Sequence, residues 1–241
     1  MRSLLLPAAL LFSLLLPVHS KAEDKHPPLD YSHQEQWKGV LNHSQSPIDI
    51  VTATATAASN KESGALLISS KRAPSQVEDN GHAVQVDTDV AEALIRGRYF
   101  RLSQFHFHSP SEHTIDGKSY PLEGHFVFRA QDGRLAVVGV MFEEGAANAG
   151  IDPVLAQLGR PHEFHQAEVD ISTLLPDDKS YYHYLGSLTT PPLTENVEWY
   201  VLSHPVTLSG AQLKELHDRH PRNNRQIQPV YGRPLIHYQS Q

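Results

Sequence analysis

The sequence has no cysteine at any of its 241 positions. A disulfide framework is therefore excluded, and so is a metal site built on thiolates. Stability has to come from packing, and any metal site has to use histidine, aspartate or glutamate. Histidine is plentiful, with 16 residues.

Long apolar runs are also scarce. The one such run lies in residues 1–22, where Arg2 precedes LLLPAALLFSLLLPV and small residues follow at Ser20 and Ala22. This arrangement predicts a secretory signal peptide cleaved after Ser20 or Ala22, and hence an exported protein, periplasmic or secreted. A membrane anchor is the alternative, but two prolines interrupt a run shorter than the roughly 20 residues needed to span a bilayer. No later segment is apolar enough to cross a membrane.

Positive charge is in deficit, since 20 Lys and Arg face 27 Asp and Glu and give a net charge of −7. An acidic chain offers no electrostatic case for nucleic-acid binding. The 39% hydrophobic content is ordinary for a globular protein. No internal repeat or second domain is evident, so residues 23–241 are predicted to form one domain.

Short runs rich in Val, Ile, Phe and Tyr occupy residues 65–142, separated by turn signals. They predict a mainly antiparallel sheet, within a mixed α/β, β-dominated fold. Residues 23–45 are predicted to form an irregular arm over the domain, and residues 52–65 an exposed loop. The predicted strands are QSPIDI, ALLISS, AVQVD, RYFRLSQFHFH, GHFVFRA and LAVVGVMF; the predicted helices are IDPVLAQLG and SGAQLKELHDRH, the second with Ser209 as N-cap.

Two of these strands carry a histidine pattern. Successive side chains of a strand alternate between faces, so Gln104, His106 and His108 share one face of QFHFH. In LEGHFVF, Glu123 and His125 share a face in the same way. If the two strands pair, three imidazoles converge, which suits catalytic zinc with an open fourth position. The alternative, surface histidines on a solvated face, has about equal weight on spacing alone.

Other histidine pairs serve as comparisons. HEFH at 162–165 is one residue short of the H-E-x-x-H metal motif, and His217 and His220 lie three residues apart on a predicted helix. Both pairs are interpreted as structural or surface residues.

Several motifs in register resemble the α-class carbonic anhydrases, and the short step from HFH to SPSEHT resembles the bacterial exported branch. The likeness runs from QSPIDI at 45 to QPVYGR near 233, most of the predicted mature chain. The motifs are QFHFH, PSEHT, LEGHFVF, LAVVGV, GSLTTPPLTENVEW and NNRQIQP.

The resemblance implies a large twisted, mainly antiparallel central sheet with short peripheral helices and a cavity reaching one zinc ion. It implies reversible hydration of carbon dioxide to bicarbonate and a proton, with weak esterase activity as a possible side reaction. His106, His108 and His125 would be the zinc ligands, and Gln104 and Glu123 their supporting partners.

The same resemblance implies the remaining roles. Thr189 would orient a zinc-bound hydroxide and Glu112 would orient Thr189. His82, in NGHA, would be the proton shuttle, with Asn80 and Tyr31 as candidates for the proton path. The implied substrate pocket consists of Val127, Val137, Leu188, Thr190, Val197 and Trp199.

One departure from the family concerns the loop that carries Thr189. Exported members often brace that loop with a disulfide, whereas this chain has Asn196 at the corresponding site and no cysteine. A non-catalytic member of the same fold is the competing function, although this chain keeps all the implied catalytic residues. The sequence leaves the choice between a monomer and a homodimer open.

Overall fold

A computed structural model gives the fold and describes residues 29–37, 43–58 and 64–240. The predicted signal peptide lies outside the described residues. Within the described part of the chain, no helix combines the length and the apolar character needed to cross a membrane.

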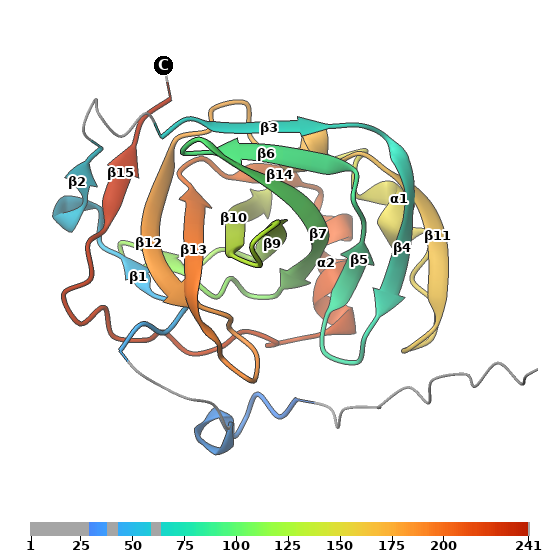
Figure 1. Cartoon of the computed structure of the whole chain (residues 1–241). Helices are drawn as coiled ribbons and strands as arrows, with labels where there is room; N and C mark the ends of the chain where they lie inside the picture. Colours follow the sequence, from blue (N-terminus) through green and yellow to red (C-terminus); the bar gives the residue numbers. More distant parts are fainter. Residues whose placement is uncertain (1–28, 38–42, 59–63, 241) are drawn as a thin grey trace, which may run out of the picture.

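A 13-stranded sheet forms the body of the molecule, in the order β11-β4-β5-β7-β9-β10-β13-β12-β15-β2 (Figure 1). β6 pairs with β7, β3 with β6, and β14 with β10. The strands are β2 Thr56–Ala57, β3 Leu66–Ser70, β4 Ala73–Asp79, β5 Val84–Asp87, β6 Ala91–Ile95, β7 Arg98–His108, β9 Leu122–Ala130, β10 Leu135–Glu144, β11 Phe164–Val169, β12 Tyr181–Ser187, β13 Glu195–Leu202, β14 Val206–Leu208 and β15 Ile236–Tyr238.

The mainly antiparallel sheet predicted from the sequence is confirmed. Its parallel pairs are β10 with β13, β10 with β14, and β15 with β2. A separate two-stranded sheet pairs β1 (Asp49–Ile50) with β8 (Thr114–Ile115). The helices are short: α1 Asp152–Leu155, α2 Gly210–Arg219, and the 3-10 turns η1 Gln34–Gln36, η2 Thr52–Thr54 and η3 Ile171–Leu174.

The prediction of an exposed loop over residues 52–65 is wrong in part. η2 forms there, and β2 adds to the sheet edge by pairing with β15. Both residues of β2 are exposed, so the strand has no alternation of buried and exposed side chains. An apolar–polar pattern in the sequence is therefore not needed for it. β2 is held to the sheet by its backbone pairing with β15.

The central strands separate two cores by their alternation. On β9, Phe126 and Phe128 face the larger core, which also takes Leu213 and Leu216 of α2. Val127, between them, faces a second buried cluster. Burying an apolar side chain of this size stabilises the fold by roughly 1.5–3 kcal/mol. The alternation along β9 therefore determines which of its faces packs against each core.

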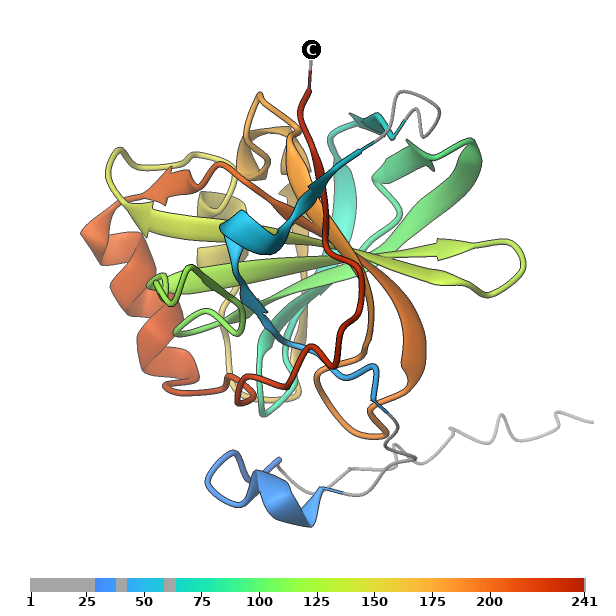
Figure 2. The same cartoon turned by 90° about the vertical axis from the view of Figure 1, so that its left-hand side faces the viewer.

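The predicted arm is confirmed over residues 29–37, where it includes η1. Gln34 anchors it, because its amide donates to the carbonyl of Asn224 and its oxygen accepts the backbone N–H of Gln226. Figures 1 and 2 show η1 at the margin of the molecule, apart from the sheet.

Candidate metal centre

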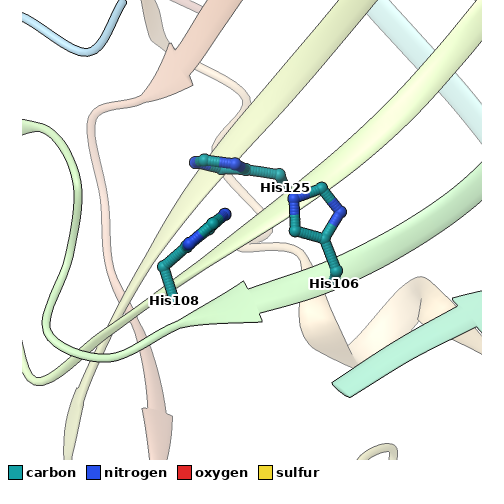
Figure 3. Close-up of side chains that lie close together, drawn as sticks. All are labelled: His106, His108 and His125. Carbon is teal, nitrogen blue, oxygen red and sulfur yellow. The ribbon is translucent and has the colours of Figure 1, made fainter. Parts of the chain in front are cut away.

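Three imidazoles converge from two neighbouring central strands, as Figure 3 shows. In the antiparallel pairing of β7 and β9, His106 lies directly opposite His125, and His108 lies opposite Glu123. One nitrogen from each of His106, His108 and His125 lies within 4.8 Å of the others. The predicted convergence is therefore confirmed, and it depends on register alone.

Each of the three rings has one nitrogen held by a hydrogen-bond partner. His106 Nδ1 pairs with Gln104 Oε1 at 2.8 Å, and His125 Nε2 pairs with Glu123 Oε1 at 2.9 Å. His108 Nδ1 pairs with the backbone oxygen of Asn223 at 2.7 Å. A second partner that fixes the tautomer and direction of the ring is typical of metal-ligating histidine.

Burial sets the charge on two of these rings. It holds the pKa of His106 well below its ordinary value and also lowers the pKa of His108. Both rings are therefore neutral near pH 7 and offer a lone pair. Burial also acts to lower the pKa of His125, but the carboxylate of Glu123 outweighs it and raises that pKa.

Glu123 links the centre to the stretch that follows β7. Its Oε1 pairs with His125 Nε2 and with His113 Nδ1 at 2.8 Å, and its Oε2 accepts the backbone N–H groups of Glu112 and His113. Burial opposes its charge, but the adjoining His113 and His125 lower the pKa of Glu123 well below its usual value. This carboxylate is ionised and fully surrounded.

His113 is buried at the same centre and, with Glu123 and His125, forms a second group whose potential ligand atoms lie within 4.8 Å of one another. Its other nitrogen, Nε2, pairs with Tyr184 Oη at 2.6 Å, so both ring nitrogens have partners. Because both nitrogens of His113 are engaged, the geometry favours a supporting role for this ring over a ligand role.

Three buried polar atoms near the centre have no hydrogen-bond partner among the described residues: His108 Nε2, Glu112 Oε2 and Tyr31 Oη. Buried polar atoms are normally satisfied, so such atoms call for an explanation. His108 Nε2 belongs to the imidazole cluster, where a metal would satisfy it. Glu112 Oε1 accepts a hydrogen bond from the backbone N–H of Arg225 at 2.6 Å. Its Oε2 can therefore accept a hydrogen bond from another group.

The loop that carries Thr189 is closed by backbone hydrogen bonds. Leu188 N–H donates to Thr194 O, and Leu193 N–H donates to Thr190 O. Thr189 is buried, with 5% of its surface exposed. A buried hydroxyl on a closed loop has a restricted direction, which suits a role in orienting another group.

Apolar side chains lie next to the cluster. Trp199 meets the ring of His125 edge-on, with centroids 4.8 Å apart. Val137 lies opposite both Val127 and Trp199 in the sheet register. The second buried core contains Val127, Val137, Val197 and Trp199, with Leu188 packed against it.

His82 lies on the loop between β4 and β5. Asn80 Oδ1 accepts the backbone N–H groups of His82 and Ala83, and Asn80 Nδ2 donates to Gln85 Oε1. Asn80 thus shapes this loop. Burial, followed by the charges of His108 and His220, lowers the pKa of His82 to about 4. A proton on His82 in this position is held only weakly.

Comparison with known proteins identifies the family. The family model described as eukaryotic-type carbonic anhydrase matches residues 32–239. The chain belongs to the α-carbonic anhydrase family. Its activity is that of a carbonic anhydrase, and the histidine triad agrees with the one zinc ion of that family.

Carbonic anhydrases of bacteria are among its relatives. One from Pectobacterium carotovorum is 43% identical over 201 residues, covering 80% of each chain. One from Klebsiella pneumoniae is 38% identical, covering 98% of this chain and 100% of the relative. The solved α-carbonic anhydrase of Photobacterium profundum has a TM-score of 0.76 at 36% identity, covering 82% of this chain and 90% of that one.

Several site residues were not identified from the sequence. Asn223 holds His108 through its backbone oxygen, and its side chain donates to the carbonyls of His82 and Phe107. Arg225 supplies the N–H that engages Glu112. Both lie in the NNRQIQP motif, which marked the family but carried no assigned role. A backbone donor or acceptor leaves no signal in side-chain identity.

Proposed function

We propose that His106, His108 and His125 hold one zinc ion and that the site hydrates carbon dioxide through the residues around it. The observation that carries this proposal is the triad itself, in which each ring has one nitrogen fixed by a partner and the three rings bring one nitrogen each within 4.8 Å of the others. Zinc held by three imidazoles acidifies a bound water, an effect for which carbonic anhydrases are themselves the standard example.

Thr189 and Glu112 would orient the attacking oxygen. An ionised carboxylate only accepts hydrogen bonds, so Glu112 Oε2 would take the proton of the Thr189 hydroxyl. The oxygen of Thr189 could then only accept a hydrogen bond from the nucleophile. The unpartnered, buried Oε2 of Glu112 supports this order of donors and acceptors.

Carbon dioxide would lie against the apolar side chains beside the triad. The pocket we propose consists of Val127, Val137, Leu188, Thr190, Val197 and Trp199. The edge-on contact of Trp199 with His125 supports it, because a small apolar substrate needs an apolar wall next to the metal. Activated esters would be slow alternative substrates.

His82 would carry the product proton outward, with Asn80 holding its loop. Tyr31 is a candidate for ordering water on this path. Burial, and to a lesser degree the negative charge of Glu112, raises the pKa of Tyr31, so its hydroxyl keeps its proton. A protonated hydroxyl can both donate to and accept from water.

The test is stopped-flow hydration of carbon dioxide by the mature protein, with zinc content measured on the same samples. His106→Ala should lose both zinc and turnover, and Thr189→Ala should keep zinc and lose most of its turnover. A protein that binds one zinc ion but does not hydrate carbon dioxide would contradict the proposal and favour a non-catalytic member of the fold.

We further propose export to the periplasm or outside the cell after cleavage of residues 1–20 or 1–22, and assembly as a homodimer. Mass spectrometry of the exported protein should give a chain starting at Lys21 or Glu23. Light scattering should give twice the chain mass. An uncleaved chain or a monomer would contradict the corresponding part.

A further inference from the structure

A cavity of about 580 Å³ adjoins the His82 loop. It lies between that loop, the segment after α2 and the N-terminal arm. Its lining is mostly polar and includes His82 and His220, together with Tyr31, Arg219 and Arg222. Two histidines distant in sequence therefore open onto one polar space, through which water can connect them.

His220 is paired with a buried carboxylate. Its Nε2 lies 2.7 Å from Asp79 Oδ1, and the side chains are 13% and 4% exposed. The carboxylate accepts a hydrogen bond from Nε2–H and so fixes the tautomer, which leaves Nδ1 of His220 as the proton acceptor. The pairing also compensates an imidazolium charge when Nδ1 takes a proton.

The same carboxylate is attached to the loop that bears His82. Asp79 Oδ1 accepts the backbone N–H of Gly81 at 3.0 Å, and the backbone oxygen of Asp79 accepts the N–H of His162. The ring of His162 lies against Gly81, where an added Cβ would approach it to 3.1 Å. Asp79 thus pairs with His220 directly and also helps to hold the segments that carry His82 and His162.

The histidines around this loop differ in exposure. The side chain of the ligand His108 is 0% exposed, that of His220 is 13% exposed and that of His162 is 44% exposed. His82 and His220 are both partly exposed, and the charge of His82 interacts with those of His108, His220 and His162.

We propose that the Asp79–His220 pair is the proton carrier that follows His82 on the way to solvent. The inference rests on the proposed shuttle role of His82. Protonated His82 passes its proton, through water in the cavity, to Nδ1 of His220. His82 returns to its neutral form, His220 becomes an imidazolium held by Asp79, and buffer or solvent then removes the proton from His220.

The other charges around the pair are compatible with this step. The guanidinium of Arg219 lies 3.8 Å from Asp79 Oδ2, but its hydrogen bonds go to the carbonyls of Leu158 and Gly159. His82 and His162 face Asp79 from its own loop and from the turn before β11. Asp30 and Arg222 line the cavity from the arm and the segment after α2.

The experiment measures carbon dioxide hydration at limiting and at saturating buffer for His220→Gln and Asp79→Asn. We expect kcat at limiting buffer to fall on the order of tenfold. Saturating imidazole should restore kcat, and kcat/KM should stay unchanged because the interconversion of substrate and product does not include this step. His204→Gln is the matched control, since His204 is an exposed histidine 3.3 Å from Asp178.

The outcomes separate the two proposals. Unchanged kcat at limiting buffer in both variants, with a loss in His82→Ala, overturns the relay alone. No loss in His82→Ala overturns the shuttle role and the relay with it. A fall in kcat/KM, or a loss that imidazole does not restore, means a structural role and also overturns the relay.

A second measurement does not depend on turnover. Long-range ¹H–¹⁵N spectra of the zinc-loaded protein should show neutral His220 as the Nε2–H tautomer. Asp79→Asn should shift its tautomer equilibrium, while His204 stays unchanged. A wild-type Nδ1–H tautomer would overturn the proposal.

Discussion

Glu123 is the residue on which the polar interior around the triad depends. It engages two imidazoles and two backbone N–H groups, and it is 0% exposed. Through His125 it acts on a metal ligand, and through the N–H of Glu112 it holds the residue that would orient Thr189. One carboxylate thus supports two separate parts of the site.

Replacing Glu123 by Gln should weaken zinc binding by about 10- to 100-fold, because His125 would lose its anionic partner. Competition with a chromophoric chelator measures the affinity. Glu143→Gln is the control, since Glu143 lies on β10 with 43% of its side chain exposed. Equal affinities for the Glu123 variant and the wild type would show that His125 does not need the anion.

The convergence of the three rings could be predicted from the sequence because the alternation of a strand is a local property, whereas their role as ligands was implied by the family resemblance. His106 and His108 share a face wherever that strand lies, and His125 needed only the pairing of β7 with the next long strand. Asn223 could not be predicted in this way. Its oxygen reaches His108 from 115 positions away, and any residue has a backbone oxygen there.

At the scale of elements, α2 is fixed at its first turn. The predicted N-cap is confirmed, since Ser209 Oγ accepts the N–H of Gln212 and Gln212 Oε1 accepts the N–H of Ser209. Gln212 also bonds to both backbone groups of Asn148 and to Asp152 of α1. A single side chain therefore joins the start of α2 to α1.

Gln212→Ala should lower the free energy of unfolding by about 1–3 kcal/mol, because it removes the glutamine half of the capping box together with the side-chain bonds to Asn148 and Asp152. Urea denaturation measures the change. Lys214→Ala, at an exposed position of the same helix, should stay within about 0.5 kcal/mol of the wild type. A similarly small change in the free energy of unfolding for Gln212→Ala would show that the link between α1 and α2 made by this side chain is not needed for stability.

Elements differ in how far the sequence predicts them. β7, β9 and β10 lie in the middle of the sheet, and they are its longest strands, with 11, 9 and 10 residues. β4 and β6 are less evident, because Pro74 lies in the first and Glu92 in the second. The parallel pairing of β10 with β13 joins residues about 60 positions apart, so no local pattern indicates it.

For the whole molecule, hydrogen bonds hold the loop of Thr189 in a chain without disulfides. Glu195 Oε1 accepts from Ser44 N–H and Gln45 Nε2, and Ser46 and Ser187 each donate a backbone N–H to the other's hydroxyl. These bonds join the segment before β1 to both ends of the loop. Bracing by covalent linkage is replaced here by a polar joint.

Thermal unfolding should therefore respond to metal and not to reductant. Chelation of zinc should lower Tm by roughly 5–10 °C, because a ligand at about 100 times its Kd stabilises the folded state by about 2.7 kcal/mol. A thiol reductant should leave Tm unchanged. Differential scanning calorimetry measures both, and a Tm that is unaffected by chelation would contradict the proposed role of the triad.

The position of the triad on paired strands makes the sheet a preorganised chelator. A flexible chelator loses conformational freedom when it wraps a metal, whereas here that loss has already occurred during folding. The metal-free and metal-bound proteins should then have nearly the same backbone, and zinc uptake should bury little apolar surface. Metal release would require the two central strands β7 and β9 to separate or the ion to leave by its open side, so exchange should be slow and indifferent to fraying at the sheet edges.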